Sequence, residues 1–152
     1  MAYKHSIKTD PASEVWRLSL GKKHFWNLTS NVGWGCENRK DDVQLIQYLL
    51  FRITWGTPVS LLPGQKYIAA DGLFGPQTNN YIRSFQQHWS HTPIDGKVHT
   101  GDGINYYTKN GSAFTIHSMN NYFYEDNEKY YSDLRMDEKL PSVLCQSLSE
   151  WY

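Results

Sequence analysis

The sequence predicts a mainly helical fold: a three-helix bundle with a small N-terminal β-hairpin and a short C-terminal helix. Apolar residues recur every three or four positions in three separate segments, and each segment follows a turn or capping signal. Period-two patterning lies on both sides of a glycine-containing turn in residues 14–29. A chain of 152 residues suits one domain, and no linker divides it, so we expect residues 1–152 to form a single domain.

Composition excludes several classes of protein. The chain has 15 basic and 15 acidic side chains, which argues against binding nucleic acid through a surplus of positive charge. No run of about 18 apolar residues predicts a membrane span. Aromatic residues make up 15% of the chain, too many for a disordered protein.

Each predicted element has a local reason. Residues 14–29 alternate on both sides of Gly21, which predicts the hairpin. The first long helix is expected to begin at Asn38, with Asp41 completing a capping box, and to end near residue 54. Its apolar stripe is broad, so we expect this helix to lie centrally. The stripe consists of Val43, Leu45, Ile46, Leu49, Leu50 and Ile53.

Three further helices follow. Pro76 suits the first turn of a second helix, because its missing N–H would be unpaired there. Ser112 is expected to cap a third helix, and Pro141 to open a short last one. The inward residues are Tyr81, Ile82, Phe85 and Trp89, then Ile116, Met119 and Phe123, then Val143, Leu144 and Leu148; Asn79, Asn80, Arg83, Gln86 and Gln87 are expected to face outward.

The most informative segment lies directly before the second helix. Asp71 can bond the backbone of its own turn, and Gly72 accepts a positive φ without steric cost. Thr78 can accept a bond from a backbone N–H in the first helical turn. A turn followed by a helix cap therefore explains the segment without any function. The motif residues are Asp71, Gly72, Gly75, Pro76 and Thr78, and the Asp-Gly pair recurs at Asp95 and Gly96.

In context, residues 31–100 resemble the bacterial peptidoglycan-binding domain of the three-helix type. That family has a helix with the pattern V-x-x-h-Q-x-x-L before D-G-x-x-G-x-x-T-x-x-A-h-x-x-F-Q. The residues that match are Val43, Gln47, Leu50, Asp71, Gly72, Gly75, Thr78, Ile82, Phe85 and Gln86, with Tyr81 at the alanine position. The sequence after Gly96 departs from the family, and residues 101–152 would form a C-terminal extension that completes the bundle.

The resemblance implies a non-catalytic module that binds the peptidoglycan of the bacterial cell wall, through its glycan or its stem peptide, without cofactor or metal. The chain is also similar to accessory components of phage tails or contractile secretion systems, which would act beside a hydrolase or a secretion-machine protein. A shallow groove with aromatic faces and a few polar groups would suffice. The candidate ligand-binding residues are Trp34, Tyr67, Phe74, Gln77, Tyr81 and Arg83.

Two other functions stay open. The scaffold could serve as a protein–protein adaptor, which exposed tyrosine pairs at 106–107 or 130–131 would favour. It could also be a small cell-wall hydrolase, although no catalytic signature is recognisable. A metal site at His88, His91, Asp95 and His99 is not expected, because Pro93 and the turn at residues 90–92 suggest that His91 lies beyond the helix end.

The N-terminal residues have no apolar stretch typical of a Sec signal, so we expect synthesis in the cytoplasm and action at the cell wall after delivery by another route. Cys36 and Cys145 could pair as a disulfide, but we expect free thiols, since a protein made in the cytosol keeps its cysteines reduced.

Overall fold

The computed structural model describes residues 2–54, 68–88 and 92–148, which form a mainly helical protein with one small antiparallel sheet. The described residues contain five α-helices and two strands. In chain order the elements are β1 (Tyr3–Ser6), α1 (Glu14–Arg17), β2 (His24–Asn27), α2 (Lys40–Thr54), α3 (Pro76–His88), α4 (Thr115–Tyr131), the 3₁₀ turn η2 (Leu134–Met136) and α5 (Ser142–Leu148).

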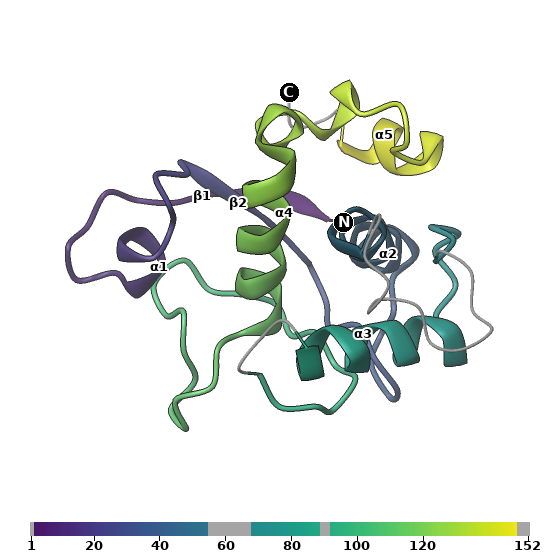
Figure 1. Cartoon of the computed structure of the whole chain (residues 1–152), viewed down its shortest axis with the longest axis horizontal. Coiled ribbons are helices and arrows are strands. Elements are labelled where there is room, and N and C mark those ends of the chain that lie inside the picture. Colours follow the sequence, from purple (N-terminus) through teal and green to yellow (C-terminus); the bar gives the residue numbers. More distant parts are fainter. Residues whose placement is uncertain (1, 55–67, 89–91, 149–152) are drawn as a thin grey trace.

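Helix α2 lies at the centre of the protein, as its broad apolar stripe predicts. Helices α3, α4 and α5 all pack against it, and Figure 1 shows it nearly end-on with α3 below and α5 above. Its apolar side chains, among them Leu45, Ile46 and Leu49, are completely buried. Burial on several sides at once explains why the stripe is wider than a surface helix needs.

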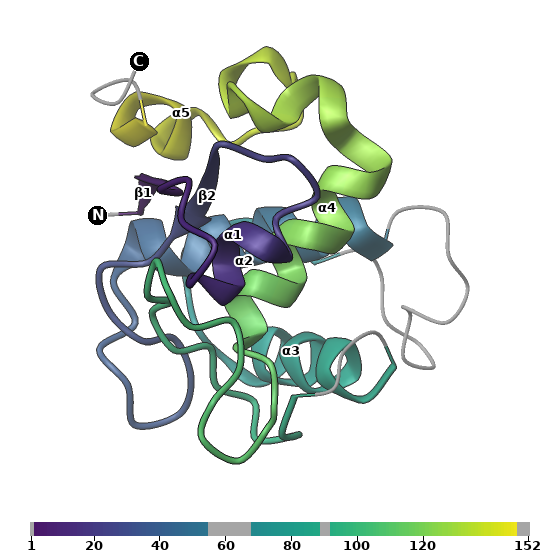
Figure 2. The ribbon, with the colours of Figure 1, turned by 90° about the vertical axis from the view of Figure 1, so that its left-hand side faces the viewer.

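The predicted hairpin over residues 14–29 is wrong in its first strand. Strand β2 pairs instead with β1, in an antiparallel register that runs from Tyr3 opposite Asn27 to Ser6 opposite His24. Residues Glu14–Arg17 form α1, because the Ser13 hydroxyl accepts a hydrogen bond from the Trp16 N–H at 3.2 Å and caps a helical turn. In the sequence, α1 lies between the two strands. Figure 2 shows it toward the viewer, in front of α4.

The start of α2 also differs from the prediction. Asn38 does not cap the helix: its backbone has a φ of +53°, and its carboxamide bonds the N–H and the carbonyl of Gly33, each at 2.8 Å. The Asp41 carboxylate accepts a hydrogen bond from the N–H of Ala2 at 2.9 Å. Both polar side chains therefore serve tertiary contacts, which a capping pattern does not reveal.

Helix α3 begins at Pro76 as predicted, but one of its outward residues was assigned wrongly. Gln86 is buried, and it bonds the chain that follows the helix. Helix α4 begins at Thr115, and Ser112 does not cap it; the Ser112 carbonyl instead accepts from the N–H of Thr108 at 2.7 Å. Trp89 lies outside the described residues.

The C-terminal part closes the core. Helix α4 continues through the tyrosine-rich acidic segment to Tyr131, with a kink at Asn127. Helix α5 follows Pro141 as predicted, and both Leu144 and Leu148 are completely buried; the side chain of Val143 is not described. Within the described residues, no helix combines the length and the apolar character that crossing a membrane requires.

Candidate functional site

A buried glutamine of α2 holds the first Asp-Gly turn. The Gln47 carboxamide oxygen accepts a hydrogen bond from the N–H of Gly72 at 2.8 Å. Its nitrogen lies 3.1 Å from Asp71 Oδ1, 3.1 Å from the carbonyl of Leu73 and 3.0 Å from Thr78 Oγ1. We call Gln47, Asp71, Gly72 and Thr78 the first glutamine cluster; it joins α2, the turn and the start of α3.

The same arrangement recurs one helix later. The Gln86 carboxamide oxygen accepts from the N–H of Gly96 at 2.9 Å. Its nitrogen lies 3.0 Å from Asp95 Oδ1, 3.0 Å from the carbonyl of Lys97 and 3.2 Å from Thr115 Oγ1. Gln86, Asp95, Gly96 and Thr115 are the second glutamine cluster, and they join α3, the second turn and α4.

Both turns need glycine at their second position. Gly72 has a φ of +78° and Gly96 a φ of +70°, in the left-handed region that other residues rarely adopt. A Cβ atom at Gly72 would also collide with the side chains of Lys40 and Gln44. The buried glutamines thus have their donors and acceptors satisfied only if each turn keeps this shape.

A surface depression of about 220 Å³ lies beside the first glutamine cluster and includes part of it in its walls. Its walls consist of Gln47, Asp71 and residues 73–78. Leu73 stands at its edge with 69% of its surface exposed, and the ring of Phe74 is half-buried. The described C-terminal residues 132–148 do not contribute to these walls.

An exposed indole extends this surface. The ring of Trp34 meets the ring of Phe74 edge-to-face, with centroids 5.0 Å apart and planes at 88°. Trp34 is 52% exposed, which is unusual for so large an apolar side chain. Trp34, Leu73, Phe74 and Gln77 therefore form one partly apolar surface beside the first glutamine cluster, and we call them the Trp34 surface.

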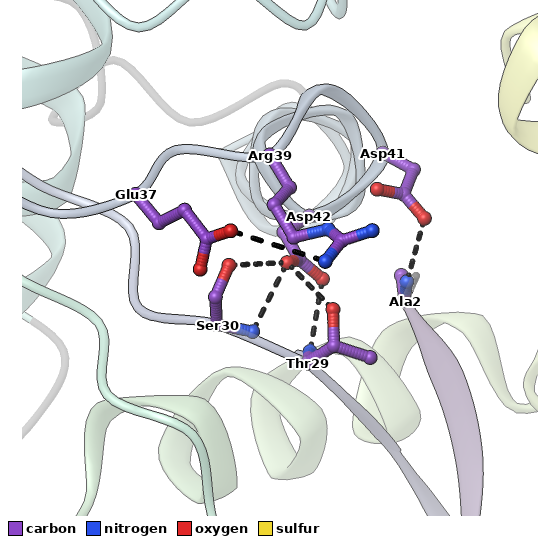
Figure 3. A network of polar contacts seen from close by, with 7 residues as sticks. All are labelled: Ala2, Thr29, Ser30, Glu37, Arg39, Asp41 and Asp42. Carbon is purple, nitrogen blue, oxygen red and sulfur yellow. Dashed lines mark hydrogen bonds and ion pairs between the residues drawn. The ribbon is translucent and has the colours of Figure 1, made fainter.

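The loop that carries Trp34 is fixed at both ends. Figure 3 shows the buried carboxylate of Asp42 in α2 accepting hydrogen bonds from the backbone N–H and the hydroxyl of both Thr29 and Ser30, at 3.0 to 3.1 Å. The two bonds between Asn38 and Gly33 close the loop around Trp34. The indole is consequently held in position before any ligand arrives.

The chain after the second cluster takes a different course from the chain after the first. After Lys97 the chain turns inward, and the completely buried Val98 pairs with Val32 through two backbone hydrogen bonds of 2.8 and 3.0 Å. Eighteen residues separate Gly96 from Thr115, whereas α3 begins a few residues after Gly72. The first turn therefore leads directly into a helix, whereas a long loop separates the second turn from the helix that follows it.

The structure separates the six candidate ligand residues. Trp34, Phe74 and Gln77 lie together on the Trp34 surface. Tyr81 is only 2% exposed and packs in the core, so it offers no ring face to a ligand at the surface. Arg83 is exposed, and its guanidinium donates to the carbonyls of Ile94 and Asp95 at 3.2 and 3.4 Å, which supports the second turn. Tyr67 lies outside the described residues.

The motif alone did not indicate that Leu73 lines the depression, that Thr115 belongs to the second cluster, or that both glutamines are buried. One signal was present: the order glutamine, Asp-Gly, threonine occurs twice in the chain. The long separation between Gly96 and Thr115 hid the second occurrence, because local spacing cannot show that two distant residues meet.

Histidine, cysteine and acidic side chains are scattered over the described part of the chain. Among the described residues no three histidine, cysteine or acidic side chains lie close enough to hold a metal ion; His91 is outside that part of the chain. Cys36 and Cys145 are not joined in a disulfide, and Glu37 is exposed with Arg39 3.9 Å away. The buried His117 has a pKa lowered to about 4, chiefly because burial disfavours its charged form. Its ring contacts Phe25 and Tyr106, on a different part of the fold.

Comparisons with protein-family models, curated proteins and solved structures yield no match to this chain.

Proposed function

We propose that this protein is a non-catalytic module that binds bacterial peptidoglycan at the Trp34 surface. In this proposal α2, α3 and α4 correspond to the three helices of the peptidoglycan-binding domain. The repeated glutamine cluster supports it most strongly, because Gln47 and Gln86 make the same hydrogen bonds to two Asp-Gly turns. The side chains of the matching motif residues therefore act together in the fold, at both Asp-Gly turns.

The chemistry of the surface suits a polymer of sugars and short peptides. Binding sites for such ligands combine apolar walls with a small number of polar groups. Here Leu73, Phe74 and Trp34 supply apolar area, while Gln77 and Asp71 supply an exposed carboxamide and carboxylate. A depression of about 220 Å³ is smaller than a typical pocket for a drug-sized ligand, of roughly 300–1,000 Å³. It fits brief contacts repeated along a polymer.

The structure offers less support for an adaptor. Tyr131 is buried and Tyr106 is half-buried with its hydroxyl bonded to Asn121, so neither tyrosine pair forms an exposed aromatic patch. A hydrolase would need a positioned acid or nucleophile at the depression. Asp71 is the acidic residue in its walls, and its Oδ1 atom is occupied by the first glutamine cluster.

Co-sedimentation with purified, insoluble sacculi tests the proposal. We expect the wild-type protein to sediment at tens of micromolar, and Leu73→Asp to reduce the bound fraction at least fivefold by placing a charge at the edge of the depression. Leu20→Asp is the matched control, because Leu20 is also exposed, at 52%, but belongs to the segment after α1. Wild-type protein that stays in the supernatant contradicts the proposal. Release of soluble muropeptides would instead indicate a hydrolase.

A further inference from the structure

We infer that the Trp34 surface recognises the glycan strand rather than the stem peptide, with the Trp34 indole as the platform on which a sugar ring stacks. This inference rests on the proposed function and specifies its ligand. It draws on three observations: the fixed exposed indole, the charge of the depression, and its size.

The indole is exposed and held in place at once. A sugar ring presents a face of C–H groups, which packs on a flat aromatic surface, and a tryptophan offers the largest such surface of any side chain. Phe74 touches the Trp34 ring edge-to-face, so the contact supports the indole while the Trp34 residue itself remains 52% exposed. The anchored loop reduces the entropy lost when a ligand binds.

The charge of the depression favours the glycan. Among the described residues in its walls none is cationic, and Asp71 contributes an exposed carboxylate. Stem peptides carry more free carboxylates than ammonium groups, so they are net anionic, and Asp71 would repel them. Glycan strands are uncharged where the lactyl group joins the peptide, and their hydroxyl and acetamido groups donate hydrogen bonds to carboxylate and carboxamide oxygens. Lys40 is the cation next to the turn, but it is not a wall residue; its side-chain stem packs over Gly72.

The size of the depression indicates how the strand is held. A volume of about 220 Å³ accommodates a small part of a polymer, with the neighbouring sugar on the indole outside it. Contacts of this kind are individually weak, and binding to an insoluble wall gains from many copies of the ligand on one surface.

Titrations with separated wall fragments test the inference on the folded, full chain. The probes are peptide-free glycan strands from amidase-treated sacculi, purified stem peptides, and oligomers of N-acetylglucosamine. The lactyl carboxylates that the amidase frees are capped as methylamides, so that the strands stay uncharged as they are in the wall. Binding is followed by NMR. We expect the glycan strands to bind and the stem peptides not to bind. Trp34→Ala should weaken glycan binding roughly tenfold, and Trp34→Phe less, because a smaller flat ring remains. Tyr107→Ala is the matched control: an exposed aromatic, 40% accessible, outside the Trp34 surface.

The outcomes separate this inference from the proposed function. Binding of stem peptides without glycan strands overturns the inference and leaves peptidoglycan binding intact. Sedimentation with sacculi but not with peptide-free strands also overturns it. Absence of binding to sacculi and to every fragment removes both. Because the comparison of fragments uses wild-type protein, the test does not depend on any variant remaining folded. Equal affinity of the wild type and Trp34→Ala for glycan strands contradicts the stacking role.

Discussion

Gln47 in α2 and Gln86 in α3 bond two Asp-Gly turns in the same way. Each accepts a hydrogen bond from the glycine N–H, at 2.8 and 2.9 Å, and each nitrogen reaches the aspartate, a backbone carbonyl and a threonine of the next helix. The two residues are both 1% exposed. A buried carboxamide thus connects α2 to α3 and, again, α3 to α4.

Replacing either glutamine should destabilise the protein. Gln47→Ala and Gln86→Ala each leave a buried glycine N–H and a buried threonine hydroxyl without their partner, at a cost of about 2–3 kcal/mol of unfolding free energy. Urea denaturation measures it. Gln87→Ala is the control, because Gln87 is exposed beside Gln86 and should change stability by less than about 0.5 kcal/mol. Equal stability of all three variants would show that the clusters contribute nothing to folding.

The two glycines of the first motif should respond differently to alanine. Gly72→Ala forces a left-handed backbone on alanine and drives its Cβ into Lys40, and we expect a loss of at least about 1–2 kcal/mol. Gly75→Ala meets no atom within 4 Å, so we expect stability to stay the same or to rise by about 0.4–1 kcal/mol. Thermal unfolding of both variants compares them directly, and a Gly75 variant as unstable as the Gly72 variant would contradict the turn geometry.

The Asp42 network should determine how firmly the Trp34 loop is held. Asp42→Ala removes the acceptor for four hydrogen bonds from Thr29 and Ser30, and we expect the unfolding free energy to fall by about 3 kcal/mol or more. Asp41→Ala is the neighbouring control: its carboxylate is only half-buried, and we expect a smaller loss of about 1 kcal/mol. Urea denaturation gives both values. Similar losses in the two variants would show that burial of Asp42 has no special weight.

Stability should fall as the pH drops from about 6.5 to about 4. Burial lowers the pKa of His24 and of His117 to about 4, from the ordinary 6.5 that each has in the unfolded chain. In that interval the unfolded state binds protons that the folded state does not, so each histidine removes up to about 1.4 kcal/mol per pH unit. Above pH 6.5 both forms are neutral and this effect disappears.

Denaturation curves between pH 4 and 7 measure this slope. His117→Gln should reduce it by less than half, because His24 and His5, whose pKa values burial also lowers, still titrate. Lys22, whose pKa burial lowers to about 8, titrates above this interval. Asp102, Asp133 and Asp137 have pKa values below the ordinary 3.8 and affect stability below it. An unchanged slope in the His117 variant would contradict the assignment.

Sequence patterns predicted the helices and missed several polar contacts. Periodic apolar residues predicted the course of α2, and Pro76 predicted the start of α3. Both predictions were correct, because apolar periodicity and backbone sterics depend on residues close together in the sequence. The alternation around Trp16 predicted a strand and was wrong. A hydroxyl at Ser13 capped a helical turn there, and the second strand found its partner at residues 3–6.

Residue order was enough to predict a mainly helical protein with a central apolar helix and two glycine turns, since these follow from periodicity and from the positive φ that glycine adopts most readily. The burial of Gln47 and Gln86, and the packing of Tyr81 in the core, became visible only in the folded chain. The same holds for the contact between Trp34 and Phe74, which lie far apart in the sequence. These contacts join residues distant in sequence, and their energies depend on which groups the folded chain removes from water.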